Sequence, residues 1–269
     1  MLDVSIIIPT LNRLDCLGPC IESIHRHTSV GYEIIVYANC CSSETAAYLH
    51  AAHRVRAIID KENRYFTEAV NRALAQARGR YVFLLNDDCV ILRSDWFTFY
   101  RGLLRLDRRV AMVGPYWKNI DELPYGWIEP YATLYPRQIF ERFGPLPYFD
   151  DSFVLWWSDI YHAYKLMAAG YHLFPLRREV VDSFVHHRRV GESGDTVLSV
   201  KERLPKECFT FHGRDLLYQR LGITNERELA GYFRGKVWER EALRLLLQHS
   251  PIDPAPWARP AEGLRASPY

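Results

Sequence analysis

The sequence lacks the features of a membrane-spanning or secreted protein. No apolar run approaches the roughly 18 residues that a spanning helix needs, and the opening Met-Leu-Asp-Val-Ser has no basic flank of the signal-peptide kind. Net charge is small, since 34 Lys and Arg oppose 32 Asp and Glu, and this gives no electrostatic case for a nucleic-acid partner. We therefore expect a soluble, cytoplasmic protein with no transmembrane segment, and leave open a peripheral contact with the inner face of the membrane.

Cysteine is scarce and has no metal-binding spacing. Among the six cysteines, Cys16 and Cys20 are four residues apart and Cys40 adjoins Cys41, but no pair of CxxC clusters of the structural zinc type occurs. Without an extracellular signal, a disulfide framework is not expected. We interpret these residues as ordinary buried thiols.

The glycine-rich loops of common nucleotide-binding folds are also missing. Neither GxGxxG nor GxxxxGK follows the first apolar strand, at residues 3–9. The sequence therefore supports neither a dinucleotide-binding fold nor a P-loop. Nucleotide phosphates would have to be held in another way, for example through a metal ion on carboxylates.

What the first ninety residues do contain is a regular alternation of strands and helices. Apolar runs predict strands at residues 3–9, 33–37, 55–59 and 81–85, and apolar residues at helical spacing predict helices over 14–27, 43–53 and 65–77. This alternation predicts a parallel sheet with covering helices.

The pattern is more mixed after residue 92. The sequence predicts helices at 95–106, 137–143 and 159–169, and strands at 110–115, 171–176 and 180–190. Residues 116–136 are rich in Pro, Gly and aromatic side chains and are expected to be irregular. Beyond Gly194, helices are expected near 196–204, 213–221 and 225–249. We see no internal repeats.

The most informative stretch is the end of the strand at 81–85, where an apolar run opens into Asn86-Asp87-Asp88. An unpaired carboxylate beside a core shifts its pKa or costs several kcal/mol. A divalent cation would be a suitable partner, since Mg²⁺ and Mn²⁺ prefer oxygen ligands and commonly hold nucleotide phosphates as well. Asn and Asp are also common turn residues, so a simple polar turn at the strand end remains the alternative.

Asp159 stands at the start of a predicted helix. A carboxylate there is stabilised by the helix dipole, which is a purely structural account of the residue. The functional account makes Asp159 a general base. The residues alone leave both accounts open.

Several segments resemble the family 2 glycosyltransferases of the GT-A fold. Residues 4–13 resemble the family's opening strand and nucleotide-binding loop, and residues 62–81 resemble the segment before its metal motif. Asn86-Asp87-Asp88 resembles that motif, usually written DxD, and residues 149–153 and 156–170 resemble the acceptor-side block. The resemblance covers roughly residues 3–190, with five motifs in the right order.

The resemblance implies an α/β fold of the GT-A type, with a mostly parallel central sheet flanked by helices. It implies a Rossmann-like nucleotide-binding half, an acceptor-binding half and a helical C-terminal extension. The expected division is a glycosyltransferase domain at 1–194, made of halves 1–92 and 93–194, an extension at 195–250 and a Pro-rich tail at 251–269.

The implied activity is the inverting transfer of a single sugar from a nucleotide-diphosphate sugar to a hydroxyl of a glycan or glycolipid acceptor. Mn²⁺ or Mg²⁺ is the implied cofactor. The processive-synthase signature QxxRW and its flanking membrane helices are missing, which favours transfer of one sugar at a time.

The resemblance also assigns roles to particular residues. Asp159 is the expected catalytic base. Asp88 is the first metal candidate and Asp87 the second, together with His186 or His187. Adjacent residues of a strand point to opposite faces, so only one histidine can enter the site, and we favour His186. Trp156 and Trp157 are expected to contact the acceptor sugar, although at least one of them is expected in the core. The expected nucleotide-binding residues are Pro9, Thr10, Asn12, Arg13, Asn39, Asn63, Asn71, Asn86 and Asp87.

The sequence departs from the family pattern at three positions. Ala38-Asn39 stands where the family commonly has an acidic residue, Asn86 where many relatives have Asp, and Ser158 where Glu is usual. These departures motivate one alternative, a sugar- or nucleotide-binding module of the same fold that is weak or inactive as a catalyst. A nucleotidylyltransferase is less favoured, because its glycine-rich, basic opening loop is missing. The oligomeric state is left open.

Overall fold

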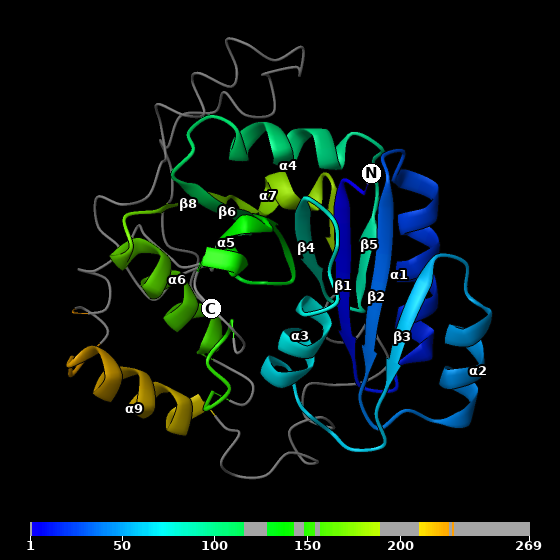
Figure 1. Ribbon diagram of the computed structural model, residues 1–269, viewed down its shortest axis with the longest axis horizontal. Helices are drawn as coiled ribbons and strands as arrows, with labels where there is room; N and C mark the ends of the chain where they lie inside the picture. Colours follow the sequence, from blue (N-terminus) through cyan, green and yellow to red (C-terminus); the bar gives the residue numbers. More distant parts are fainter. Residues whose placement is uncertain are drawn as a thin grey trace.

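A sheet of seven strands lies at the centre of the molecule, in the spatial order β3-β2-β1-β4-β7-β6-β8 (Figure 1). The structure is a computed structural model that describes residues 2–115, 128–142, 148–153, 157–188, 210–225 and 228, with the backbone alone at 210–212. The strands of the sheet are β1 (Val4–Thr10), β2 (Tyr32–Ala38), β3 (Val55–Ile59), β4 (Tyr81–Leu85), β6 (Val110–Pro115), β7 (Ala132–Pro136) and β8 (His172–Leu176). A separate antiparallel pair is formed by β5 (Cys89–Ile91) and β9 (Val185–His187).

The sheet is mostly parallel, as the sequence predicts. β1 lies parallel to both β2 and β4, and β2 lies parallel to β3. Strand β7 runs antiparallel to β4 on one side and to β6 on the other, while β6 and β8 are parallel. The expectation of irregular structure over 116–136 was wrong for β7, and residues 116–127 lie outside the described part.

Both faces of the sheet are covered by helices. Consecutive residues of β1 point to opposite faces, so each face contributes side chains to a separate core cluster. Ile6 and Ile8 belong to one core cluster and Ile7 to the other, and all three are fully buried. The first cluster includes side chains of α1 (Leu14–His27), α2 (Ser43–Ala51), α4 (Trp96–Leu104) and α7 (Arg178–Asp182). The second includes side chains of α3 (Thr67–Leu74), α5 (Gln138–Arg142), α6 (Ser158–Ala168) and α9 (Thr210–Leu221).

The predicted strand at 180–190 was wrong at its start. The chain forms the short helix α7 there and only then enters β9. The Ser183 hydroxyl donates to the Val180 carbonyl at 2.7 Å, and the Phe184 N–H donates to Val181 at 2.8 Å. These local hydrogen bonds close helical turns that the β-branched valines alone do not favour.

Helix α9 is part of the same folded body as the sheet. Leu217, Leu221 and Ile223 are buried in the second core cluster, and Arg220 pairs with Asp150 at 2.5 Å. The helix predicted at 213–221 is therefore present. The helix expected at 196–204 and the tail at 251–269 lie outside the described residues. So does the helix expected at 225–249, apart from residues 225 and 228.

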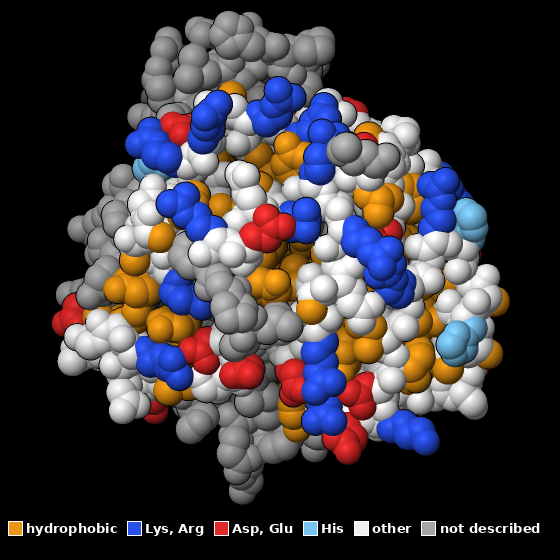
Figure 2. Space-filling view, viewed as in Figure 1, with side chains coloured by type: hydrophobic (Ala, Val, Ile, Leu, Met, Phe, Trp, Pro, Cys, Tyr) orange, Lys and Arg blue, Asp and Glu red, His pale blue; other side chains and the backbone are white. Residues whose placement is uncertain are grey.

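Within the described ranges, no helix is both long and apolar enough to cross a bilayer. Charge is dispersed over the face that Figure 2 shows, where Lys and Arg side chains are spread over the view with Asp and Glu side chains among them.

Candidate active site

Three loops meet at the carboxyl ends of β1, β2 and β4. Because these strands are parallel, residues 10–13, Asn39 and residues 86–88 come to the same edge of the sheet. The Thr10 hydroxyl donates to Asp87 Oδ2 at 2.6 Å, and the Asn39 N–H donates to the Thr10 carbonyl at 2.9 Å. Open α/β sheets bind ligands at such an edge.

Two adjacent carboxylates lie at this edge with one arginine between them. Arg13 Nη1 is 3.6 Å from Asp87 Oδ1 and 3.5 Å from Asp88 Oδ2. Burial and the charge of Asp88 raise the pKa of Asp87 to about 7, although Arg13 and Thr10 oppose the rise. A further positive charge beside Asp87 would lower its pKa and favour its ionised form.

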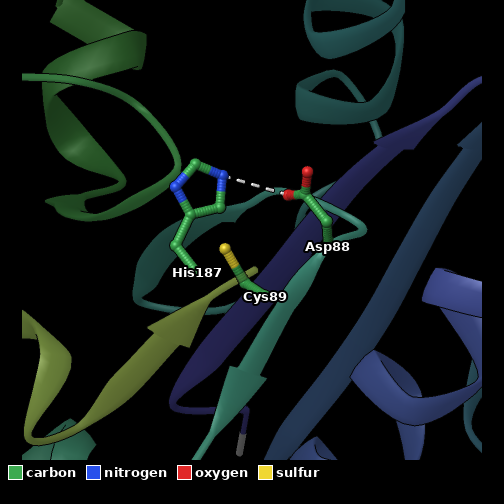
Figure 3. Close-up of side chains that lie close together, drawn as sticks. All are labelled: Asp88, Cys89 and His187. Atoms are coloured by element: carbon green, nitrogen blue, oxygen red, sulfur yellow. Dashed lines mark ion pairs between the residues drawn. The ribbon is translucent and has the colours of Figure 1, made fainter. Parts of the chain in front are cut away.

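Asp88 faces a histidine from the small two-stranded sheet. His187 Nε2 lies 3.2 Å from Asp88 Oδ1, and Cys89 lies next to both, as Figure 3 shows. The His187 ring stacks on Tyr131, with ring centres 4.3 Å apart and planes inclined by 15°. Burial alone would raise the pKa of Asp88, but His187 and Arg13 outweigh it, and the pKa lies below its ordinary value.

This geometry favours His187 as the metal candidate, whereas the sequence analysis favoured His186. In the β5–β9 ladder His187 is paired with Cys89 and His186 with Val90, so the two imidazoles leave the ladder on opposite sides. His186 is exposed, whereas His187 meets Asp88. Adjacent strand residues do point to opposite faces, as the sequence analysis assumed. Which histidine faces Asp88 depends on the register between β9 and β5, a strand far away in the sequence.

A glutamate that the sequence analysis did not identify, Glu129, lies within electrostatic range of Asp159 and His187. Glu129 just precedes β7, and its backbone N–H donates to the Pro115 carbonyl at 2.8 Å. Burial and the charge of Asp159 raise the pKa of Glu129 to about 7, while His187 acts in the opposite direction. Glu129 falls in the stretch predicted to be irregular, and nothing in that stretch singles it out.

Asp159 lies in the first turn of α6. The residue before this helix, Trp157, has the left-handed φ of 74°, and the buried Ser158 hydroxyl accepts from Thr67 Oγ1 at 3.1 Å. Burial raises the pKa of Asp159 to about 6, although backbone N–H groups, among them that of Ile160, favour its charged form. A carboxylate with this pKa can accept a proton near neutral pH.

A comparison with protein families decides the identity of the fold. Residues 5–164, more than half of the 269 residues, match the model of glycosyl transferase family 2. The chain belongs to glycosyl transferase family 2.

Sequence relatives of this family 2 chain match only in part. The chain is 24% identical over 123 residues to the glycosyltransferase GlyG of Streptococcus pneumoniae, covering 44% of this chain and 40% of that protein. It is 36% identical over 101 residues to the uncharacterized protein y4gI of Sinorhizobium fredii, covering 35% of this chain and 11% of that protein. The chain thus matches less than half the length of these curated relatives.

Solved structures resemble the family 2 chain in fold. The mannosyltransferase PcManGT from Pyrobaculum calidifontis, in complex with GDP-Man and Mn²⁺, has a TM-score of 0.54 and 16% identity, covering 93% of this chain and 76% of that one. Glucosyl-3-phosphoglycerate synthase from Mycobacterium tuberculosis, in complex with Mn²⁺, UDP and glucosyl-3-phosphoglycerate, also has a TM-score of 0.54 and 16% identity, covering 83% and 81%. At this identity the likeness shows the fold alone, and it confirms the predicted GT-A type.

Several asparagines that the sequence assigned to the nucleotide are occupied by hydrogen bonds within the family 2 domain. Asn39 is buried and donates to the carbonyls of Thr10 and Tyr65, while its Oδ1 accepts from the Arg64 N–H at 2.7 Å. Asn71 is buried and bonded in both directions to the backbone of Phe149, at 2.8 and 2.9 Å. In the structure, therefore, these two residues join segments of the fold rather than expose their amides.

The remaining nucleotide-binding candidates are held by backbone hydrogen bonds or by their place in a strand. Asn12 Oδ1 accepts from the Ser42 N–H at the start of α2, and Asn63 Oδ1 accepts from the Tyr65 N–H, each at 2.9 Å. Pro9 lies within β1, and the Asn86 N–H donates to the Tyr131 carbonyl at 3.0 Å.

Of the two tryptophans expected at the acceptor, the structure describes one. Trp156 lies outside the described residues. Trp157 is partly buried and packs against the second core cluster, which agrees with the expectation that at least one of the pair contributes to the core.

Proposed function

We propose that the chain transfers a single sugar, with inversion, from a nucleotide-diphosphate sugar to a hydroxyl group of a glycan or glycolipid. The observation that carries this proposal is the Asp88–His187 pair at the carboxyl edge of the parallel strands, 3.2 Å apart. Membership of glycosyl transferase family 2 supports sugar transfer in general. The inversion, the metal and the acceptor class are parts of the proposal.

The residues around Asp88 fit a divalent cation. Asp88 Oδ1 is buried, and among the described residues no hydrogen bond of standard geometry reaches it. A carboxylate oxygen and an imidazole nitrogen together suit Mn²⁺, and Mg²⁺ accepts the oxygen with waters completing its shell. Mn²⁺ or Mg²⁺ bound there would supply positive charge that stabilises the departing nucleoside diphosphate. The structural neighbours named above were solved with Mn²⁺.

Arg13 adds a fixed positive charge on the same side of the site. Its guanidinium already contacts Asp87 and Asp88, so it lies where a diphosphate held near Asp88 would also lie. A guanidinium presents several N–H donors in one plane and suits phosphate oxygens. We infer that Arg13 holds the diphosphate and offsets its charge.

Asp159 is the proposed base. A single displacement inverts the anomeric carbon only if the base and the leaving group stand on opposite faces of the sugar. Asp159 lies on α6, a different element from the loop that carries Asp88. Its pKa of about 6 leaves it ionised at neutral pH yet basic enough to take the acceptor's proton. Glu129, with its raised pKa, would remain partly protonated beside it and limit the negative charge at that end.

The experiment separates donor binding from turnover. UDP and GDP are titrated calorimetrically in Mn²⁺ against the purified protein and the Asp159→Ala variant, and release of nucleoside diphosphate from the matching sugar donor is then measured with acceptors. We expect both proteins to bind the same nucleotide and only the unaltered protein to transfer. Unchanged transfer by Asp159→Ala would remove the base from the mechanism, whereas binding without turnover in both would favour a non-catalytic binding module.

A further inference from the structure

Cys89 lies directly across the β5–β9 ladder from His187. The sulfur of Cys89, a carboxylate oxygen of Asp88 and a ring nitrogen of His187 all lie within 4.8 Å of one another (Figure 3). Cys89 is fully buried, and its sulfur lies beside the other two donors. This sulfur plays no part in the transfer chemistry proposed above.

We propose that Cys89 is a third protein ligand of this centre, and that the centre therefore takes thiophilic divalent ions such as Zn²⁺ and Co²⁺. The inference rests on the proposed metal site at Asp88 and His187 and extends it to a sulfur donor. It changes the class of ion that the site selects.

The donor set differs from one built for Mg²⁺ or Mn²⁺. Those ions favour oxygen donors, whereas a combination of sulfur, nitrogen and oxygen is typical of Zn²⁺. In tetrahedral zinc sites, bond lengths of roughly 2.0–2.3 Å place the donor atoms about 3.3–3.6 Å apart. Asp88 and His187 are 3.2 Å apart, close to that spacing, and the Cys89 sulfur lies within 4.8 Å of both donor atoms.

Binding also requires a change in the thiol. Cys89 Sγ lies 3.5 Å from the Tyr131 carbonyl, to which the thiol donates. When the sulfur–metal bond forms, the S–H bond breaks, and the proton passes to solvent. Tyr131 also stacks on His187, so one residue orients both neighbouring donors. The fourth position of a tetrahedral ion would remain for water or a phosphate oxygen.

Cys20 provides a matched control. It is as fully buried as Cys89 and also lies near the metal motif, with Sγ 3.7 Å from the Asn86 carbonyl. Among the described residues it is not part of the Asp88–Cys89–His187 group. Loss of the Cys20 thiol should therefore disturb packing to a similar degree without removing a ligand.

The test compares the full chain with its Cys89→Ser and Cys20→Ser variants. Each is titrated with Co²⁺ while near-ultraviolet absorption is recorded, because a cobalt–thiolate bond gives a charge-transfer band. Zn²⁺ and Mn²⁺ affinities are then measured by calorimetry. We expect the band in the unaltered chain and in Cys20→Ser but not in Cys89→Ser. The Zn²⁺ affinity of Cys89→Ser should fall by about tenfold or more, with a much smaller change for Mn²⁺.

A cobalt–thiolate band that persists in Cys89→Ser would overturn the proposal, as would equal losses of Zn²⁺ and Mn²⁺ affinity. Absence of the band in the unaltered chain would also overturn it. Cys89→Ala replaces the serine variant if serine prevents folding, since alanine leaves no buried hydroxyl. None of these measurements depends on turnover: a chain that shows the band but binds no nucleoside diphosphate would contradict the proposed function and leave the sulfur ligand standing.

Discussion

Replacing the proposed base with its neutral isostere should abolish transfer and, at the same time, stabilise the fold. Burial raises the pKa of Asp159 to about 6 from an ordinary value of 3.8. The folded chain therefore holds this proton more tightly than the unfolded chain, and stability falls as the pH rises from about 4 to about 6. Above that window the folded protein bears the full cost of an ionised Asp159, a cost that Asp159→Asn removes.

The size of the effect follows from the shift. At about 1.4 kcal/mol for each pH unit, a shift of about two units gives an upper bound near 3 kcal/mol. Asp159 is only partly buried, so solvent screening reduces the figure, and we expect a gain of about 1–2 kcal/mol in the free energy of unfolding at pH 8. At pH 4 the gain should nearly vanish, because the folded carboxyl is already neutral. At pH 8, where Asp159 is ionised, transfer should fall by roughly 10²–10⁴-fold or more, and the loss should be much smaller at pH 4, where the unaltered carboxyl is itself protonated.

Urea unfolding at pH 4 and pH 8 measures the stability, and nucleoside diphosphate release measures the transfer. Asp107→Asn is the matched control, and its expected change in stability has the opposite sign. Hydrogen bonds from Arg109 lower the pKa of Asp107 to about 2, so losing this charge should lower stability at pH 8, by less than about 1 kcal/mol. An Asp159→Asn protein that is no more stable than the unaltered chain at pH 8, or that still transfers sugar, would refute the assignment.

Two further predictions test separate parts of the account. Asn71→Ala should lower the free energy of unfolding by about 2–4 kcal/mol, because it leaves the buried N–H and carbonyl of Phe149 without their partners; urea unfolding checks this, and a loss below about 1 kcal/mol would contradict it. His187→Ala should lower Mn²⁺ affinity about tenfold or more in calorimetric titration, whereas His186→Ala should leave it unchanged; equal losses in the two variants would disprove the assignment of His187.

The nucleotide half of the fold is predictable from local sequence. The strand before Asp87 is a continuous apolar run, and the strand before the Thr10 loop is mostly apolar, with Ser5 within it; such runs identify strands buried on both faces. Their parallel arrangement then brings Thr10, Arg13, Asp87 and Asp88 together, as the contacts between them show.

Features that depend on distant partners are not predictable in this way. Strand β7 is inserted antiparallel between β4 and β6, and its pairing rather than its own composition makes it a strand. The choice of His187 over His186 depends on the register between β5 and β9. Glu129 and Tyr131 reach the site only because β7 takes its place beside β4.

The roles of polar residues near strand ends are hard to assign from the sequence alone. Asn39 resembles a ligand-binding residue in the sequence, and so does Asn71 on its helix. Both are buried, and their amides bind backbone groups of other segments. A sequence shows that such a side chain needs partners, but it does not show whether these belong to the protein or to a ligand.

The central claim is that a metal at Asp88 holds a nucleoside diphosphate at the carboxyl edge of the sheet. The most direct measurement is calorimetric titration of UDP and GDP, with Mn²⁺ and with excess chelator, against the unaltered chain and Asp88→Asn. We predict that at least one nucleotide binds the unaltered chain in Mn²⁺, and that this binding is lost with chelator and in Asp88→Asn. Binding that survives both changes, or no binding of either nucleotide, would contradict the claim.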